Sequence, residues 1–199
     1  MPVRAVIFDL DGTITQPCLD FDAIRSELGI APGTPVLEAM AAMDPARRAE
    51  AARVLERHES AAAASSILHE GAQDVLAGLR HRGIRIGLLT RNSRQSVHTV
   101  LRRHGLRFDF VRTREDGAVK PAPEPVLAVC RALGVEPGET LTVGDYLFDI
   151  QSGAAAGTRT ALMVGRGTPP PFAHQADYVI RRLDQILEIV DGRLSREAS

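Results

Sequence analysis

The sequence predicts an α/β fold: a five-stranded parallel sheet covered by helices on both faces, with a small all-helical module inserted after the first strand. From Gly71 onward, short apolar stretches alternate with segments whose apolar residues recur at i, i+3, i+4 and i+7. This alternation is typical of a parallel sheet covered by helices. The segment 15–70 contains no convincing strand and is dense in alanine from Ala39 through Ala64. With 199 residues, 44% of them hydrophobic, the chain is long enough for one substantial core.

The five expected strands are short stretches rich in β-branched or other apolar residues. The first is the run Ala5-Val6-Ile7-Phe8, which ends at a pair of acids. The others, in chain order, lie at 84–89, 108–111, 141–143 and 161–164. Their apolar character along the whole stretch is typical of strands that are buried on both faces.

Four helices are predicted between and after these strands from the spacing of their apolar residues. The predicted faces begin at Ala72, Val97, Val126 and Leu183. The glycines Gly83, Gly105 and Gly134 stand where C-terminal helix caps are expected.

The inserted segment is predicted to form three short helices. The first begins around Phe21, and the pairs Thr34-Pro35 and Asp44-Pro45 each place an N-cap residue before a proline. We therefore expect a core domain of residues 1–14 and 71–199, with residues 15–70 as a separate small lobe. Ligands bind at the carboxyl ends of parallel strands, so a lobe inserted there would cover the site.

Composition and charge narrow the possible partners. The formal net charge is -1, and no basic stripe is present, so neither nucleic acid nor a membrane surface is an expected partner. No apolar run approaches the roughly 20 residues of a membrane-spanning helix, and the N-terminus lacks the pattern of a secretory signal. Two distant cysteines, Cys18 and Cys130, indicate neither a disulfide framework nor a zinc site. We expect a cytoplasmic protein, a monomer or weak homo-oligomer, that binds a small molecule.

Two acids one residue apart follow the first strand, in the segment Phe8-Asp9-Leu10-Asp11-Gly12-Thr13. Alternation along an extended chain directs Asp9 and Asp11 to one side. Burial and like charge oppose the ionisation of both, so the pair suggests a cation between them, or one acid that attacks while the other carries a proton. An ordinary turn is the alternative, because Asp and Gly favour turns anywhere.

Further polar residues follow the later strands directly. Thr90, Arg91 and Asn92 come after 84–89, while Gly144-Asp145 follows 141–143 with Asp149 four residues later. Each could simply serve a turn or a helix cap. If they gather with Asp9 and Asp11, however, four acids meet at one end of the sheet. Oxygen ligands without His or Cys indicate Mg²⁺.

Lys120 is the only lysine among 24 lysine and arginine residues. Every other basic residue of this kind in the chain is arginine, so a lysine at this position suggests a place where arginine does not fit. A compact ammonium suits a tight pocket that joins a carboxylate to a phosphoryl oxygen, whereas the planar guanidinium is larger and prefers a forked geometry.

Together these residues resemble the motifs of the haloacid dehalogenase superfamily, in the superfamily's order across nearly the whole chain. The Asp-x-Asp-x-Thr motif is similar to Asp9-Leu10-Asp11-Gly12-Thr13, and the Ser or Thr that closes a strand is similar to Thr90. The lysine followed by proline is similar to Lys120-Pro121, and the Gly-Asp pair with a later Asp is similar to Gly144-Asp145 and Asp149. The helical insert resembles a C1-type cap, as in subfamily I enzymes of phosphoglycolate phosphatase type.

The resemblance implies a Rossmann-like sheet and a Mg²⁺-dependent phosphatase. Asp9 would attack phosphorus and form an aspartyl-phosphate, and Asp11 would protonate the leaving oxygen and then activate water. The Mg²⁺ ligands that the resemblance implies are the Asp9 side chain, the backbone carbonyl of Asp11, and Asp145. The phosphate would be bound by Thr90, Arg91, Asn92 and Lys120, with Asp149, Thr13 and Gly144 in supporting positions. The expected substrate is a small phosphorylated metabolite, phosphoglycolate-like or a sugar phosphate.

Asp11 distinguishes this chain from the dehalogenases of the superfamily, which lack an acid there because a halide leaves without a proton. Two other functions remain open. One is a phosphosugar mutase of the same superfamily, which needs a cap that excludes water. The other is a phospho-Asp signalling receiver-like domain, although its lysine would follow the last strand, whereas Lys120 precedes the strand that leads to Asp145.

Overall fold

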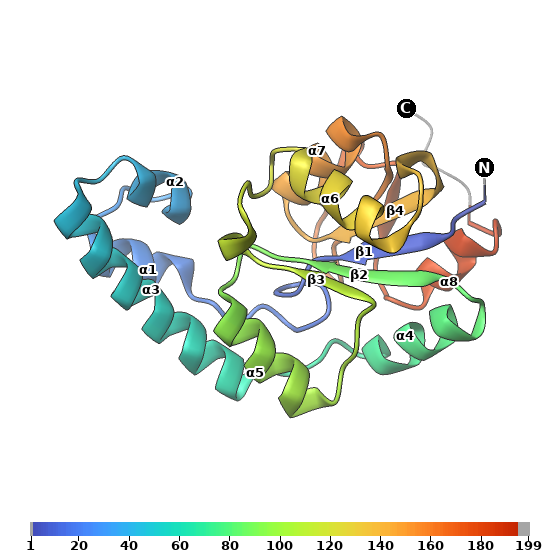
Figure 1. Ribbon diagram of the computed structural model, residues 1–199, viewed down its shortest axis with the longest axis horizontal. Helices are drawn as coiled ribbons and strands as arrows, with labels where there is room; N and C mark the ends of the chain where they lie inside the picture. Colours follow the sequence, from blue (N-terminus) through green and yellow to red (C-terminus); the bar gives the residue numbers. More distant parts are fainter. Residues whose placement is uncertain (1, 195–199) are drawn as a thin grey trace.

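The structure is a computed structural model that describes residues 2–194. A six-stranded parallel sheet lies at its centre, in the order β3-β2-β1-β4-β5-β6 (Figure 1). The strands are β1 (Ala5–Phe8), β2 (Arg85–Leu89), β3 (Phe110–Arg112), β4 (Thr140–Gly144), β5 (Arg159–Met163) and β6 (Tyr178–Ile180). The predicted α/β class is confirmed. The chain adds strands outward from β1 and then crosses to β4 on its other side, so a topological switch point lies between β1 and β4.

The prediction of five strands was wrong by one, because it did not include β6. This strand has only three residues and pairs with the edge of β5, where Val164 N donates to Ile180 O at 2.9 Å. Three residues are too few for an alternating pattern to be recognised in the sequence. The expected strand at 108–111 also begins later, at Phe110.

Helices cover both faces of the sheet (Figure 1). α6 (Glu124–Leu133) and α7 (Leu147–Ala156) lie on one face, and α4 (Ala72–His81), α5 (Arg94–His104) and α8 (Gln185–Val190) lie on the other. The fully buried strand β1 contributes residues to the apolar cores on both faces of the sheet. Val6 and Phe8 pack with residues of α4, α5 and α8, whereas Ala5 and Ile7 pack with residues of α6.

The predicted helix ends are largely confirmed. Gly105 and Gly134 are left-handed C-caps of α5 and α6. The C-cap of α4 is Arg82, and Gly83 follows it with a φ of 69°. The last helix, expected from Leu183, begins at Gln185.

Three helices between β1 and α4 form the lobe: α1 (Phe21–Leu28), α2 (Val36–Ala41) and α3 (Pro45–Ser65). They enclose a small apolar core of Ile24, Val36, Met40, Ala51 and Leu55. The prediction of short helices was wrong for α3, which has 21 residues, because its alanine-rich sequence contains no helix-breaking residue after its first position.

The two predicted N-caps of the lobe differ in outcome. Asp44 caps α3, since its side chain accepts from Ala46 N and Arg47 N at 3.0 Å each. Thr34 does not cap α2, whose N-cap is Pro35. The last turns of α3 run alongside α5 (Figure 1), and Ala63 belongs to the core beneath the sheet. One helix therefore joins the lobe to the main body.

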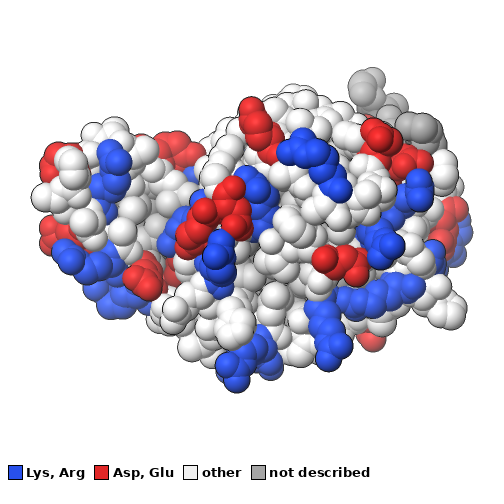
Figure 2. Space-filling view, viewed as in Figure 1, with Lys and Arg blue, Asp and Glu red and all other residues white. Residues whose placement is uncertain are grey.

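The surface view shows acidic and basic side chains interspersed over the visible face (Figure 2). Within residues 2–194, no helix combines the length and apolar character required to cross a membrane.

Candidate active site

Asp9 stands where β1 ends, beside β4. Its backbone N–H donates to Val143 O at 2.9 Å, which extends the pairing of the two strands. The chain then turns at Gly12, with a φ of 85°. A Cβ at Gly12 would lie 2.2 Å from Oδ2 of Asp145, so glycine permits both the turn and the close approach of this second acid.

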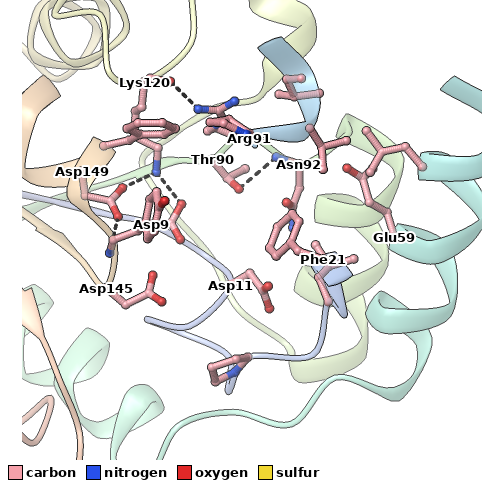
Figure 3. Close-up of a pocket in the computed structure, with 18 of the residues that line it drawn as sticks. Asp9, Asp11, Phe21, Glu59, Thr90, Arg91, Asn92, Lys120, Asp145 and Asp149 are labelled. Atoms are coloured by element: carbon pink, nitrogen blue, oxygen red, sulfur yellow. Dashed lines mark hydrogen bonds and ion pairs between the residues drawn. The ribbon is translucent and has the colours of Figure 1, made fainter. Parts of the chain in front are cut away.

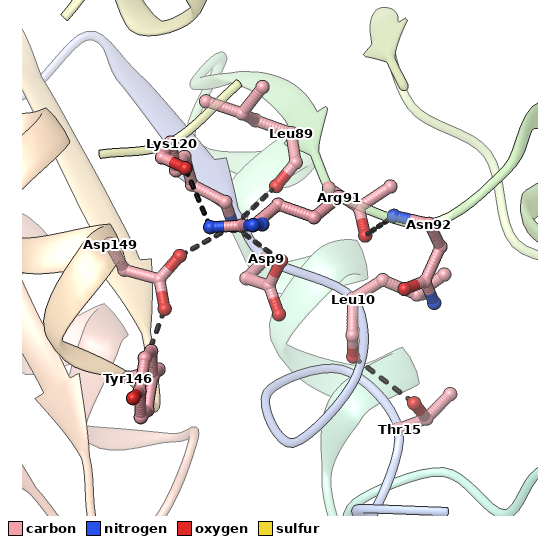
Figure 4. A network of polar contacts seen from close by, with 10 residues as sticks. Asp9, Leu10, Thr15, Leu89, Arg91, Asn92, Lys120, Tyr146 and Asp149 are labelled. Carbon is pink, nitrogen blue, oxygen red and sulfur yellow. Dashed lines mark hydrogen bonds and ion pairs between the residues drawn. The ribbon is translucent and has the colours of Figure 1, made fainter. Parts of the chain in front are cut away.

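Lys120 is buried at the centre of the site and joins three segments of the chain (Figure 4). Its Nζ lies 2.5 Å from Oδ1 of Asp9, 2.5 Å from Oδ1 of Asp149 and 3.0 Å from Leu89 O. An ammonium has three N–H donors, and each has a partner here. Burial opposes the charge on Lys120, but the carboxylates of Asp149 and Asp9 outweigh it and raise the pKa.

Three carboxylates converge beside this ammonium. Asp9, Asp145 and Asp149 each present an oxygen, and these oxygens all lie within 4.8 Å of one another. Asp149 is buried against Gly144, where a Cβ would lie 2.1 Å from its Cγ. Asp149 uses one oxygen for Lys120 and the other for Tyr146 N at 3.0 Å. Among the described residues, the Asp145 carboxylate has no hydrogen-bond donor, so Asp145 is free for another ligand.

The electrostatics of the acids favour a cation. Burial raises the pKa of Asp9 and of Asp145, and the neighbouring acids raise both further. Lys120 lowers both but does not cancel the rise. Three acids and one base leave negative charge in a buried position, which an added divalent cation with oxygen ligands would neutralise. The carboxylate oxygens of the three acids are therefore suitable ligands for such an ion.

Asp11 faces a different set of partners from Asp9. Its Oδ1 accepts from Cys18 N at 3.3 Å, from Cys18 Sγ at 3.1 Å and from Thr15 Oγ1 at 3.5 Å. Burial raises the pKa of Asp11, and the hydrogen bonds from Cys18 lower it in part. The structure thus separates the two acids of the first motif: Asp9 joins Lys120, and Asp11 is held by the linker to the lobe.

The residues after β2 line the opening toward the lobe. Thr90 is buried, and its Oγ1 accepts from Asn92 N at 3.2 Å. Arg91 reaches across to α2, where it donates to both carboxylate oxygens of Glu38 at 2.7 and 2.8 Å. It also donates to Lys120 O at 2.8 Å. The guanidinium predicted to bind phosphate is therefore engaged between the lobe and the core.

Thr13 is buried at the turn of the first motif. Its hydroxyl oxygen has no hydrogen-bond partner within residues 2–194.

A family model of haloacid dehalogenase-like hydrolases matches residues 25–163. This chain belongs to that family.

Relatives across the whole chain agree with the match. The chain is 32% identical to the N-acetylmuramic acid 6-phosphate phosphatase of Pseudomonas putida, over 98% of this chain and 99% of that protein. It is 31% identical to the pyrophosphatase PpaX of Bacillus pumilus, over 94% and 96% of the two chains. The solved structure of a HAD phosphatase from Thermococcus onnurineus is 27% identical, with a TM-score of 0.69 over 96% of this chain and all (100%) of that one. The predicted resemblance to phosphatases of this superfamily is confirmed.

In this haloacid dehalogenase-like hydrolase, a cavity of about 400 Å³ lies between the strand ends and the lobe (Figure 3). Asp9, Asp11, Thr90, Lys120 and Asp145 are all among its lining residues. Residues named at separate points of the sequence thus share one cavity.

The lobe contributes lining residues that the sequence did not identify as site residues. Glu59 of α3 is buried, accepts from Ser93 N at 3.2 Å and forms an ion pair with Arg114. Its signal in the sequence is an acid four residues after Leu55, on the buried stripe of α3. Phe21, at the start of α1 in the lobe, also lines the cavity, as does Tyr146, which follows β4 in the core. An aromatic residue at a helix start or after a strand gives no sequence signal that marks it as a site residue.

Proposed function

We propose that this family member is a Mg²⁺-dependent phosphatase that hydrolyses a small phosphorylated metabolite through an aspartyl-phosphate on Asp9. The observation that carries the proposal is the buried Lys120 between Asp9 and Asp149, with Asp145 completing the acid cluster. A nucleophilic carboxylate must remain ionised in a buried site, and the ammonium 2.5 Å away favours that state. The names of the relatives favour hydrolysis over the mutase and receiver-like alternatives.

The proposed reaction has two steps. The Asp9 carboxylate attacks phosphorus, the bond from phosphorus to the leaving oxygen breaks, and Asp11 donates a proton to that oxygen. Water then attacks the phosphorus of the aspartyl-phosphate and gives a proton to Asp11, which releases phosphate and restores Asp9. The raised pKa of Asp11 supports the transfer of a proton in both directions.

The other residues position the substrate. Thr90 and Asn92 would bind the phosphoryl oxygens, and Lys120 would offset the negative charge of those oxygens. Arg91, whose guanidinium is engaged by Glu38 and by Lys120 O, would act in support by joining the lobe to the core. The carboxylates of Asp9 and Asp145 and the backbone carbonyl of Asp11 would hold Mg²⁺, which neutralises charge as an anionic substrate approaches an anionic carboxylate. Asp149 would act in support, since both of its oxygens are already in use.

Residues 15–70 would act as the cap over this site, and residues 1–14 and 71–199 as the catalytic core, of which 195–199 lie outside the described residues. Phe21 and Glu59 of the lobe line the cavity across from Asp145 and Asp149 (Figure 3), which supports a role of the lobe in selecting the leaving group. The family resemblance implies phosphoglycolate-like or sugar-phosphate substrates, and the lining of this cavity would select among them.

Phosphate release from phosphomonoesters tests the proposal directly. We expect release with Mg²⁺, loss of release in EDTA and recovery when Mg²⁺ is restored. Substrate labelled with ³²P and quenched in acid during turnover should leave protein-bound label that hydroxylamine removes. Metal-independent hydrolysis, or turnover without such label, would contradict the mechanism.

Thermal unfolding tests the cation site without an activity assay. Burial and neighbouring acids raise the pKa of Asp9 to about 7 and that of Asp145 to about 8. A carboxyl with a raised folded-state pKa stabilises the protein fully below its unfolded-state pKa, and that contribution is lost as pH rises through the folded-state value. The Tm of the metal-free protein should therefore fall between pH 5 and pH 8. Mg²⁺ about 100-fold above its Kd should raise the Tm by about 5–10 °C at pH 8.

Asp145→Asn separates the metal from other causes of this shift. The variant removes one crowded carboxylate, so we expect a higher Tm than wild type at pH 8 without metal, together with no response to Mg²⁺. Asp74→Asn, an exposed position on α4, removes the same charge and should keep the full response. A normal Mg²⁺ shift in Asp145→Asn would place the cation elsewhere.

A further inference from the structure

Two of the large hydrophobic residues that are exposed within residues 2–194 lie in the active-site cavity. Phe21 is 44% exposed and Tyr146 is 52% exposed, and both line the cavity, whereas Ile67, 61% exposed, does not. Apolar surface left in water is unfavourable, and exposed aromatic groups inside a cavity typically mark the place of a ligand. Phe21 comes from α1 of the lobe, and Tyr146 comes from the turn after β4, next to Asp145.

The aromatic wall on the core side is fixed in place before any ligand arrives. Tyr146 packs edge-on against Phe148, with ring centroids 5.1 Å apart, and against Phe172 at 6.2 Å. The guanidinium of Arg91 lies 4.8 Å from the centroid of the Phe148 ring. These contacts orient the rings and lower the entropy cost of binding against them.

The lobe side of the cavity is apolar, and the charged residues on this side and at the opening after β2 are already paired. Besides Phe21, it offers Leu19, Pro35, Val36, Leu37 and Leu55. Away from the acids of the first motif, the acid cluster and Lys120, the charged lining residues each have an ion-pair partner: Arg25 with Asp22, Glu59 with Arg114 and Arg91 with Glu38. A second anionic group on the substrate would have to break one of these pairs, whereas an apolar group would replace water along the wall.

On the basis of the proposed phosphatase activity, we propose that the substrate is a phosphomonoester whose leaving group carries an apolar or aromatic face, bound against Phe21 and Tyr146. A cavity of about 400 Å³ is large enough for a ring in addition to the phosphate. The cavity is poorly suited to a small substrate with a second anionic group, such as the carboxylate of 2-phosphoglycolate.

Three phosphomonoesters with alkyl leaving groups test the class: 2-phenylethyl phosphate, ethyl phosphate and 2-phosphoglycolate. All three release an alkyl alcohol whose oxygen is protonated by Asp11, so a large difference in kcat/KM reports binding of the leaving group rather than its chemistry. We expect kcat/KM for 2-phenylethyl phosphate to exceed that for each of the others by about 10-fold or more. Phe21→Ala and Tyr146→Ala should each reduce the ratio of 2-phenylethyl to ethyl phosphate by about fivefold. Ile67→Ala, an exposed apolar position outside the cavity, should leave the ratio unchanged.

The outcomes separate this proposal from the proposed function. Release of phosphate with equal or reversed preference overturns the substrate class alone. A preference for 2-phenylethyl phosphate that both Phe21→Ala and Tyr146→Ala retain in full places the ring elsewhere and overturns the assigned contacts. No release from any of the three esters in Mg²⁺ overturns the phosphatase activity and this proposal with it.

Discussion

Replacing Asp9 with asparagine is expected to lower phosphate release by at least about 10³-fold while leaving the protein folded. The amide cannot form the acyl phosphate, so the path through a covalent intermediate is lost rather than slowed. The fold survives because Lys120 keeps its contact with Asp149 at 2.5 Å and with Leu89 O at 3.0 Å. Its charge is therefore not left unpaired.

Steady-state rates and acid-quench labelling together identify the role of Asp9. Asp9→Asn should show neither turnover nor hydroxylamine-sensitive label, with a Tm close to that of wild type. Asp74→Asn removes an equal charge from the exposed face of α4 and should retain both turnover and label. Turnover of Asp9→Asn within tenfold of wild type would assign the nucleophile to another group.

Replacing Lys120 with methionine is expected to cost about 3–5 kcal/mol of unfolding free energy at neutral pH, in addition to activity. Removing one partner of a buried ion pair leaves an uncompensated buried charge, and here the loss exposes Asp9 and Asp149 to each other. The Lys120 side chain is only 4% exposed, so water cannot take over its role. Arginine should not restore stability, because a planar guanidinium cannot direct three donors from one point at three acceptors.

Urea unfolding at two pH values tests this explanation. Without Lys120 the pKa of Asp9, which burial raises, stays raised, so the stabilising protonated form of Asp9 is present at low pH and is lost as pH rises. The deficit of Lys120→Met should therefore be smaller at pH 5 than at pH 8. Adding Asp149→Asn should recover part of it, whereas Arg85→Met, at an exposed position of β2, should cost little at either pH. An equal deficit at both pH values would indicate lost packing instead of unpaired charge.

The sequence alone predicted many residues of the candidate site because these residues follow strand ends. Asp9, Thr90 and Asp145 each come directly after an apolar stretch, and the carboxyl ends of parallel strands share one edge of a sheet. Lys120 was found from residue usage, as the only lysine of the chain. These are local signals, and they needed no knowledge of packing.

Other features depended on contacts between distant segments. The ion pair of Arg91 with Glu38 joins residues 53 positions apart, and Glu59 meets Arg114 across 55 positions. The edge strand β6 is defined by its pairing with β5 rather than by its own three residues. The spacing of apolar residues within one segment carries no information on which distant segment it will contact.

The sequence by itself thus determined the α/β class, the family motifs and the order of the acids along the chain, because hydrophobic periodicity and residue spacing are local properties. Only the tertiary structure decided how the acids differ. It placed Asp9 and Asp149 on one ammonium, turned Asp11 toward Cys18 and, within residues 2–194, left the oxygens of Asp145 without hydrogen-bond donors. It also brought Phe21 and Tyr146 to the same cavity. Those arrangements follow from how side chains from separate elements pack into one volume, which fixes their orientations and partners.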